Sequence, residues 1–592
     1  MTIALSPLVF EPAKIMQLYR AGETTKICDE YIALMKQLEK QLYITADAKQ
    51  LKEFNDRAST ILYLFVQNDF IIPPAYARAF VTTSHLLANL ISMSAYETAD
   101  GALCHLLSME NNFVKLLVLY SCYTKPIINP DQLFGAEPQL ASMWWQNYQT
   151  APAGSLSEEM HKSMTMQLKK PPTNFILSNI MTAPLYFQCI YYTEGSEEKP
   201  IKEMFNREIK RLAKAQRPIK NYAEKHKIAI VSGRWQPTTA VYKSLYPLVE
   251  ALKDKYDLTL IHFGENEDQI DGGLFNRIKK VSVSKDLMTM DLRQIELNGY
   301  QLAFFTDIGM NAESVYLSNV RFAPIMATGY GHPVSTFGSE IDYFIGGAEV
   351  EDASLAEYNY SERLVLIPGI GATPVNPKYE RKCVEKDTFT INCCWTAAKI
   401  NYPMLKLLRE VIDEADRDVR VAFFPSWTVS RYNNAIPLQK YLSRVLDHRT
   451  TVHLDKKYHE YLELLEKGSI TLDSYPFGGY NTVVDSMFVG VPVVSIEGGQ
   501  FYNRAAAALN RRLGLDNLIT HDIESCKTKL LELINDSELL TKKTEALDDV
   551  AHLEKVLLDS PEPKGFSRAI DYLIDNHDEL KAQDSNEPIV IT

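Results

Sequence analysis

Apolar residues recur every three or four positions across residues 12–123, which is the spacing of amphipathic helices. The set Ile27, Tyr31, Leu34, Met35 and Leu38 forms one such stripe. Residues 113–120 are apolar almost throughout, so we expect a buried helix there. No period near 34 residues is visible, and the pattern therefore does not indicate a helical repeat protein. We expect residues 1–222 to form an all-helical domain.

From residue 227 onward, short apolar runs alternate with helix-like stretches. The first series lies at 228–231, 258–262, 302–305, 343–345 and 364–367. A Gly- and Pro-rich crossing at 368–374 separates it from a second series at 389–393, 419–424, 451–454, 469–472 and 491–495. Short apolar strands separated by helices indicate parallel sheets covered on both faces. The predicted fold class is therefore α/β, with doubly wound lobes at 223–375 and 376–592, and with ligands beyond the carboxyl ends of the strands.

Composition excludes several classes of function. The 62 basic and 75 acidic residues leave a net charge of −13, which argues against nucleic acid or an anionic membrane as the main partner. The eight cysteines are scattered without a C-x-x-C pair, which is typical of reduced thiols and not of a disulfide framework or zinc site. We see no secretory signal and no apolar run of about 20 residues, so we expect a cytoplasmic protein without a membrane span.

The segment after the strand at 469–472 carries the most informative chemistry. Gly478 and Gly479 precede a helix that we expect to begin at Asn481. Glycines at a helix start let backbone N–H groups approach an anion such as a pyrophosphate, and the helix dipole favours negative charge there. Asp485 lies four residues after Asn481, on the same helix face, where a carboxylate can bind ribose hydroxyls. The alternative is a plain strand-to-helix turn with a solvated or capping Asp485, and spacing alone leaves both open.

Several segments in the same order resemble glycosyltransferase family 41. They are NVRFAPIMATGYGHP at 319–333, WTAAK at 395–399, DSYPFG at 473–478, NTVVD at 481–485, VGVPVV at 489–494 and RAAAALNRRLGL at 504–515. This family holds the O-linked GlcNAc transferases and the bacterial cytoplasmic N-glycosyltransferases that modify adhesins. The likeness extends from about residue 227 to residue 515. A helical N-terminal region in place of tetratricopeptide repeats is closer to the bacterial branch.

The resemblance implies a GT-B fold, in which the second of two Rossmann-like lobes holds most of the nucleotide-sugar donor. By this match, Lys399 neutralises the donor diphosphate, and His332 approaches the sugar or its phosphate from the first lobe. The implied donor-binding residues are Thr396, Lys399, Phe477, Gly478, Gly479, Tyr480, Asn481 and Asp485. The resemblance gives Thr396 a bond to the diphosphate, Gly478 to Tyr480 the role of backbone donors, and Asp485 the ribose.

Neither a metal nor another cofactor is expected, and the donor is a substrate. A preorganised cation and a helix N-terminus stabilise the charge that builds on the leaving phosphate. The nearest Asp-x-Asp, formed by Asp416 and Asp418, lies at a charged helix end, where a solvated surface is the simpler interpretation.

The acceptor side departs from the family pattern. The bacterial branch carries a histidine-rich loop after the first strand of the first lobe, whereas the matching loop here, 232–242, contains no histidine. Arg234 and Thr239 stand where histidines align, and Val429 replaces a donor-site glutamine. Asp307, Arg234, Gln236 and Glu497 are possible substitutes for the acceptor-side group, and we count Asp307 with His332 and Lys399 as catalytic candidates. Trp235 either stacks on a sugar ring or packs against the loop.

Three hypotheses follow. The first is a transferase that moves a hexose from a UDP-sugar to protein side chains, with glucose preferred because the bacterial branch favours it. The second is a transferase that extends a sugar already attached to protein, because a hydroxyl needs different contacts from an asparagine amide. The third is a catalytically silent partner that keeps the fold, against which the joint presence of Lys399, Asn481 and Asp485 argues.

Overall fold

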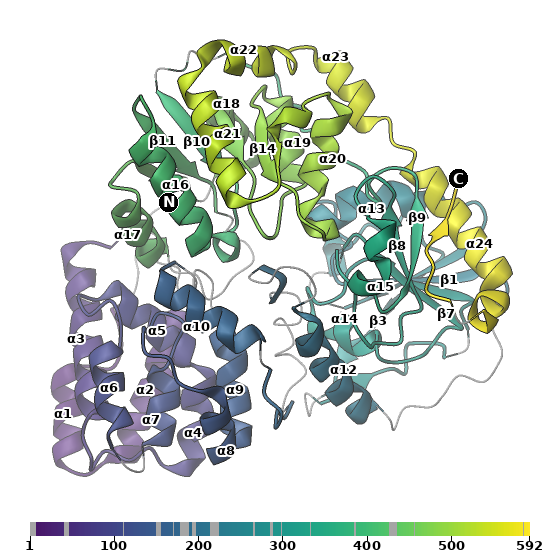
Figure 1. The fold of residues 1–592 in the computed structure, drawn as a ribbon. Coiled ribbons are helices and arrows are strands. Elements are labelled where there is room, and N and C mark those ends of the chain that lie inside the picture. The colour runs from purple at the N-terminus through teal and green to yellow at the C-terminus, as the bar shows by residue number, and fades with distance from the viewer. Residues whose placement is uncertain are drawn as a thin grey trace. The chain divides into compact units, whose positions relative to one another are not determined.

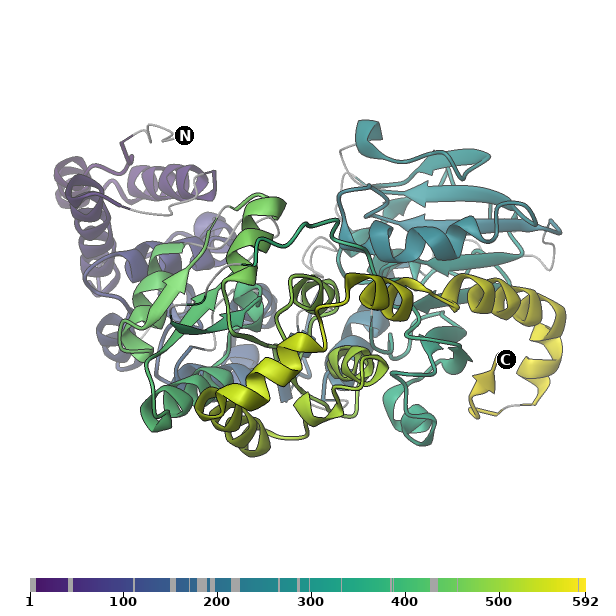
Figure 2. The same cartoon turned by 90° about the horizontal axis from the view of Figure 1, so that it is seen from above.

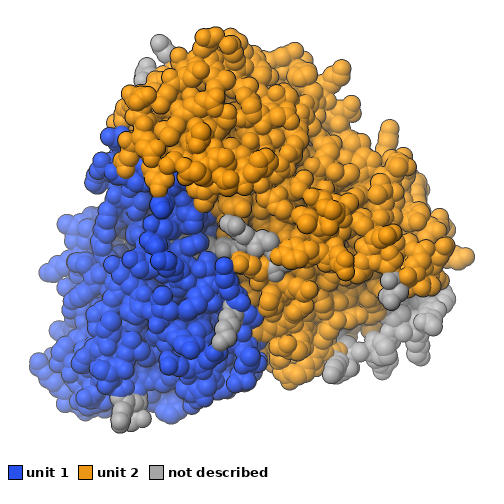
Figure 3. Space-filling view, in the orientation of Figure 1, with its two compact units in different colours: residues 1–176, 395–409, 423–455 blue, residues 177–394, 410–422, 456–592 orange. Residues whose placement is uncertain are grey.

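The computed structural model describes most of the chain, and its described residues fall into two compact units. The described residues are 7–40, 46–109, 112–149, 156–169, 171–177, 189–191, 197–213, 224–263, 267–284, 288–297, 299–331, 333–383, 386, 388–425, 435–454, 456–583 and 585–592. Unit 1 comprises residues 1–176, 395–409 and 423–455, and unit 2 comprises 177–394, 410–422 and 456–592 (Figure 3). The predicted domain boundary at residue 375 falls inside unit 2, and the three predicted domains stay a prediction.

Unit 1 is mainly helical, as predicted for the N-terminal region (Figure 1). Its N-terminal helices are α1 (Pro12–Arg20), α2 (Thr24–Glu39), α3 (Ala48–Phe65), α4 (Pro74–Thr82), α5 (Ser84–Met93), α6 (Asp100–Leu107), α7 (Phe113–Leu119), α8 (Pro130–Ala136), α9 (Pro138–Gln149) and α10 (Glu158–Lys169). The apolar stripe predicted between Ile27 and Leu38 is the buried face of α2. Later segments add α17 (Ala435–Val445), which packs against α5, and β12 (Thr450–Val452).

The first sheet of unit 2 has eight strands in the order β16-β9-β8-β7-β6-β1-β2-β3, all paired in parallel. These strands are β1 (Lys227–Ser232), β2 (Asp257–His262), β3 (Arg277–Lys280), β6 (Leu302–Phe305), β7 (Ile325–Gly329), β8 (Tyr343–Gly347), β9 (Arg363–Ile367) and β16 (Ile589–Val590). The short strands β4 (Ser282–Val283) and β5 (Met290–Asp291) form an antiparallel pair. The five apolar runs predicted for the first lobe correspond to β1, β2, β6, β8 and β9.

The second sheet has the strand order β12-β11-β10-β13-β14-β15. Its further strands are β10 (Phe389–Cys393), β11 (Val419–Phe423), β13 (Ile470–Leu472), β14 (Val493–Ile496) and β15 (Ile519–Thr520). β10, β13, β14 and β15 pair in parallel within unit 2. Two mostly parallel sheets with interleaved helices agree with the predicted α/β class.

Helices surround both sheets. They are α12 (Lys199–Ala213), α13 (Ala240–Glu250), α14 (Ala312–Leu317), α15 (Ala356–Asn359), α18 (Tyr458–Glu466), α19 (Asn481–Phe488), α20 (Ala505–Arg512), α21 (Ile523–Asn535), α22 (Ser537–Glu545), α23 (Val550–Leu553) and α24 (Glu562–Ala582), while α16 (Tyr402–Glu414) has residues in both units. In the described part of the chain, no helix combines the length and apolar character needed to cross a membrane.

The C-terminal segment returns to the first sheet. Helix α24 packs against α13 and β9, and the two views show it beside the teal strands (Figures 1 and 2). The rings of Phe304 and Phe566 meet edge to face, with centroids 4.8 Å apart, and β16 pairs with β9. The predicted second lobe extends to residue 592, whereas the structure places α24 and β16 on the first sheet. Short apolar runs did not reveal this return, because a strand of two residues has no periodicity.

The chain therefore passes between the two sheets of unit 2 twice. The first passage lies between the end of β9 at Ile367 and the start of β10, where the Gly- and Pro-rich crossing was predicted. Gly369 there has a φ of +91°, and a Cβ atom at Gly369 would lie 2.1 Å from the Glu562 carboxylate. Glu562 is fully buried and accepts a hydrogen bond from the N–H of Ile370 at 2.7 Å. The first residue of α24 thus fixes the crossing.

Candidate functional site

A buried carboxylate holds the loop between β13 and α19, which we call the glycine turn (residues 473–480). β13 ends at Leu472, and the side chain of Asp473 follows directly. Its Oδ1 accepts hydrogen bonds from the N–H groups of Ser474 at 2.9 Å and Gly479 at 2.8 Å. Because a buried carboxylate needs such donors, these bonds fix the path of the turn.

No side chain fits at either glycine of the turn. A Cβ atom at Gly478 would lie 2.8 Å from a carboxylate oxygen of Asp473. A Cβ atom at Gly479 would lie 2.4 Å from the hydroxyl oxygen of Thr482. Glycine is favoured here because the side chains of Asp473 and Thr482 lie directly against the backbone of the turn.

The backbone donors of this region are divided between internal bonds and open positions. The Gly478 N–H donates to the carbonyl of Tyr502 at 2.8 Å, and the Gly479 N–H donates to Asp473, so in this structure both glycine donors are engaged. The next three N–H groups, of Tyr480, Asn481 and Thr482, have no hydrogen-bond partner among the described residues. Of the predicted backbone donors only Tyr480 is open, and the open set extends into the first turn of α19.

Asn481 and Asp485 lie one turn apart on α19, and both have capacity for a ligand. The Oδ1 atom of Asn481 is buried and has no partner in the described part of the chain. The side chain of Asp485 is 5% exposed, and its Oδ1 accepts a hydrogen bond from the Tyr458 hydroxyl at 2.5 Å. Burial raises the pKa of Asp485 to about 7, although hydrogen bonds from Tyr458 and Tyr461 and the charge of Lys243 lower it. The charged form is therefore poorly solvated and would gain from further hydrogen-bond donors.

Tyr480 connects the glycine turn to the segment that crosses from the first sheet. Its side chain is buried, and its hydroxyl donates to the carbonyl of Ala372 at 2.9 Å. Its ring meets the ring of Tyr330 edge to face, with centroids 5.2 Å apart. Tyr330 directly precedes the Gly-His-Pro segment, so the two loops that the sequence singled out are in contact within unit 2.

The Gly-His-Pro segment follows β7. A Cβ atom at Gly331 would lie 1.6 Å from the carbonyl oxygen of Thr306, so only glycine permits this approach of the loops after β6 and β7. His332, the residue predicted to approach the donor sugar, lies outside the described residues. Its role stays a prediction.

Asp307 lies directly after that approach, at the carboxyl end of β6, and is fully buried. Its Oδ2 is 3.3–3.4 Å from the hydroxyls of Ser232 and Thr306 and from the N–H of Gly233. Its Oδ1 has no partner among the residues that the structure describes. Burial raises the pKa of Asp307, and the charge of Arg234 and these hydrogen bonds lower it by less. The Oδ1 atom of Asp307 is therefore available to accept a hydrogen bond from a ligand or to receive a proton.

The acceptor-loop residues are mostly engaged in building the loop. Thr239 caps α13: its Oγ1 accepts from the N–H of Tyr242 at 3.2 Å and donates to the carbonyl of Arg234 at 2.5 Å. Trp235 is 1% exposed and belongs to the core of the first sheet. Arg234 and Gln236 are partly exposed. Among the four acceptor-side candidates, Arg234 and Gln236 have side chains at the surface that neither cap a helix nor pack in the core.

Two further candidates have partners that assign them structural tasks. Glu497 is buried, and its carboxylate accepts a hydrogen bond from Arg511 at 2.8 Å and lies 3.6 Å from Arg504. Phe477 stacks on the ring of Tyr502, with centroids 5.4 Å apart and planes 9° from parallel. Val429 lies outside the described residues.

Thr396 and Lys399 follow the carboxyl end of β10 and belong to unit 1. Thr396 precedes a short 3₁₀ helix (Ala397–Lys399), and its Oγ1 is buried with no partner in the described chain. Lys399 is partly exposed, and its N–H donates to the carbonyl of Thr396 at 2.8 Å. The ring of Trp395 packs edge to face on Phe423 at 5.7 Å, which fixes the start of this segment.

Tyr458 and Lys243 were not predicted from the sequence. Tyr458 begins α18, and Lys243 lies on α13, more than 200 positions away in the chain. The Lys243 ammonium lies 5.6 Å from the centroid of the Tyr458 ring. Neither residue is in a motif, and their link to Asp485 depends on a tertiary contact that spacing cannot reveal.

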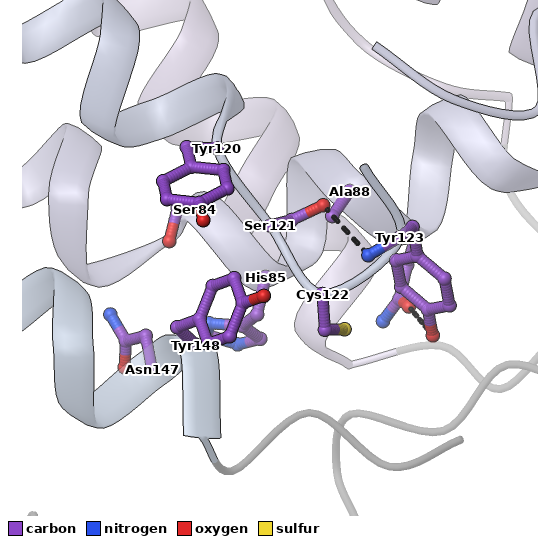
Figure 4. A pocket seen from close by; sticks show the side chains of 10 residues that line it. Ser84, His85, Ala88, Tyr120, Ser121, Cys122, Tyr123, Asn147 and Tyr148 are labelled. Atoms are coloured by element: carbon purple, nitrogen blue, oxygen red, sulfur yellow. Dashed lines mark hydrogen bonds between the residues drawn. The ribbon is translucent and has the colours of Figure 1, made fainter. Parts of the chain in front are cut away.

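A polar pocket in unit 1 is a different kind of feature. Residues of α5, α9 and the loop after α7 line it, among them His85, Tyr120 and Tyr148 (Figure 4). Its free volume of about 10 Å³ holds roughly one water molecule, whereas small-molecule sites need several hundred Å³. Burial lowers the pKa of His85 to about 4, so the pocket also carries no positive charge from this residue near pH 7.

The chain is similar to several known glycosyltransferases. Over 92% of its length the chain is 22% identical to a UDP-glucose:protein N-beta-glucosyltransferase of Actinobacillus pleuropneumoniae serotype 5b, and the match covers 95% of that protein. A probable UDP-N-acetylglucosamine–peptide N-acetylglucosaminyltransferase SPINDLY of Solanum lycopersicum is 23% identical over 36% of this chain and 24% of its own length. The solved structure of an O-GlcNAc transferase mutant of Thermobaculum terrenum has a TM-score of 0.58 at 16% identity, covering 98% of this chain and all of that one. No family model matches.

Proposed function

We propose that this chain, a member of glycosyltransferase family 41, transfers a hexose, preferentially glucose, from a UDP-sugar to a protein. The observation that carries the proposal is the start of α19, where three open N–H groups, the unpartnered Asn481 oxygen and the buried Asp485 carboxylate lie within two turns. This set offers donors for a diphosphate and an acceptor for ribose hydroxyls. Both are parts of a UDP-sugar.

The diphosphate would bind at the first turn of α19. The N–H groups of Tyr480, Asn481 and Thr482 are open, and the helix dipole adds a positive potential at this end. Lys399, by its match to the family segment, would add a cation. By its own match to the family, Thr396, whose buried hydroxyl has no partner among the described residues, would bond to the diphosphate.

During transfer, the acceptor atom attacks the anomeric carbon of the donor sugar. The bond between that carbon and the β-phosphate oxygen breaks, and its electron pair leaves with UDP. Negative charge therefore builds on the β-phosphate, where the open N–H groups and Lys399 would stabilise it. We expect no divalent metal to be needed for this step, and full activity in EDTA would support that expectation.

A sugar hydroxyl as acceptor is the second candidate, and the acceptor loop at 232–242 favours it, because this loop contains no histidine and a hydroxyl needs different contacts from an asparagine amide. Any acceptor loses a proton as it attacks, and Asp307, whose Oδ1 has no partner among the described residues, is the proposed group to receive it. With a sugar hydroxyl as acceptor, the product is a protein-linked sugar extended by one hexose. His332 would contact the donor sugar in both candidates.

We further propose that the protein works in the cytoplasm. None of the eight cysteines, all of which lie among the described residues, forms a disulfide, and five of them are buried. Free thiols that persist in a folded protein are typical of a reducing compartment. A UDP-sugar and a polypeptide or glycosylated polypeptide are the proposed partners.

The test is an assay of UDP release with UDP-glucose, UDP-galactose and UDP-GlcNAc, each against a peptide, a glucosylated peptide and a free sugar. We expect release with UDP-glucose and a peptide-based acceptor. Transfer to the glucosylated peptide alone would select the second candidate. No release in any combination, together with no UDP binding by calorimetry, would refute the proposed function.

A further inference from the structure

Asp485, which the proposed donor site assigns to the ribose, already has a hydrogen-bond partner. The Tyr458 hydroxyl donates to its Oδ1 at 2.5 Å, within the range of strong hydrogen bonds to a carboxylate. The Asp485 side chain is 5% exposed, so few positions for donors are open around it. A carboxylate oxygen can accept two hydrogen bonds, but Tyr461 also bonds to this buried group, so a ribose diol competes with the Tyr458 hydroxyl for Oδ1.

Tyr458 is placed so that it can move away. It is the first residue of α18, and its side chain is 48% exposed. Its ring stacks on Tyr461 with centroids 6.1 Å apart, and its hydroxyl donates a hydrogen bond to Asp485. Exposed side chains change rotamer on the nanosecond scale or faster, so movement of Tyr458 requires no change in the fold.

Lys243 contacts the outer face of the same ring. Its ammonium lies 5.6 Å from the ring centroid, a distance at which a cation is attracted to the π face of a tyrosine. Its charge also favours the ionised form of Asp485. Because Lys243 lies on α13, next to the first sheet, it connects the two sheets of unit 2 through Tyr458.

We propose that Tyr458 is a specificity-determining residue that occupies the diol position on Asp485 until a ribose replaces its hydroxyl, with Lys243 holding its ring in that position. The inference rests on the proposed donor site at α19. It adds a selection step: a ligand with a vicinal diol displaces Tyr458, whereas a ligand without one binds and leaves Tyr458 on Asp485. Displacement also releases the contact with Lys243.

Calorimetry on the full-length protein tests this inference with two probes, UDP and its 2′,3′-dideoxy analogue. Tyr458→Phe keeps the ring and removes the competing hydroxyl, so we expect UDP to bind about two- to tenfold more tightly, the range of one hydrogen bond. We expect the dideoxy analogue to bind the variant and the wild type equally. Tyr256→Phe is the matched control, since it removes a hydroxyl bonded to Asp571 at 2.7 Å, away from this site.

A double-mutant cycle tests the role of Lys243. Tyr458→Phe should tighten UDP binding less in a Lys243→Met background than in the wild type, because the tyrosine that it removes is then no longer held by Lys243, while the direct effect of the Lys243 charge on Asp485 is the same on both sides of the cycle and cancels. Unchanged or weaker UDP binding by Tyr458→Phe would overturn the inference, as would an equal gain with the dideoxy analogue. Absence of UDP binding by the wild type would instead refute the donor site itself, which distinguishes the two failures.

Discussion

The glycine turn and the acceptor loop are built alike but leave different groups open. Each follows a buried parallel strand and leads into a helix. In the glycine turn, Asp473 takes over the internal hydrogen bonds, and the donors at the start of α19 stay available. In the acceptor loop, Thr239 and Trp235 are used for capping and packing. The partners that a group already has therefore decide, together with its type, how readily it can bind a ligand.

The largest effect is expected from Lys399→Ala. If this lysine neutralises the leaving diphosphate, kcat/KM for UDP release should fall by roughly a thousandfold, the upper range for one stabilising group. The fold should persist because the side chain is partly exposed, and circular dichroism checks this. Lys542→Ala, on the exposed side of α22, serves as the control. Wild-type turnover in Lys399→Ala would show that the diphosphate binds elsewhere.

Asp485→Asn should change how stability depends on pH. The folded-state pKa of about 7 lies above the unfolded value, so the folded protein binds an extra proton between about pH 4 and 7 and loses stability as the pH rises through that window. The amide removes this loss, which is of order 4 kcal/mol. Calorimetric melting should therefore show a higher Tm for the variant at pH 8 and little difference at pH 4. A difference that does not vary with pH would contradict the raised pKa.

Gly479→Ala tests the open N–H groups that follow the glycine turn. Its Cβ would lie 2.4 Å from the Thr482 hydroxyl and 3.0 Å from the Asp473 carboxylate that holds the turn, so these side chains must shift and disturb the N–H groups at the start of α19. We expect UDP affinity to fall on the order of tenfold, about one hydrogen bond's contribution. Gly101→Ala, where the added atom meets nothing within 4 Å, should leave affinity unchanged. Equal affinity in both variants would place the diphosphate away from α19.

Thr239→Ala tests the acceptor loop, where Thr239 already serves as a helix cap, and this change should have the smallest effect. Loss of the cap of α13 costs about 1 kcal/mol of stability, measured by thermal melting. The KM for the acceptor should stay unchanged, and Thr239→Ser should restore stability. A large rise in the KM for the acceptor without loss of stability would indicate that Thr239 contacts the acceptor.

The sequence predicted ten of the strands in the two large sheets, the helix start at Asn481 and the shared face of Asn481 and Asp485, because these depend on local periodicity. It missed β3, β7, β15 and β16. It did not predict which N–H groups are open, since the Gly478 donor is taken by the carbonyl of Tyr502, 24 positions later. Nor could it place Lys243 beside Tyr458, which requires the packing of α13 near α18. Local periodicity thus located the candidate site in the sequence, whereas tertiary contacts decide which of its groups are open to a ligand.

The return of the C-terminus to the first sheet has a consequence for synthesis on the ribosome. The apolar face beside Phe304 is completed by Phe566, which is translated more than 250 positions later. At a translation rate of about 5–20 residues per second, that face stays exposed for on the order of 13–50 seconds before Phe566 is made. The first sheet can therefore finish folding only after the whole second sheet has been made. A nascent chain paused before residue 560 would expose this face to chaperones or to other chains.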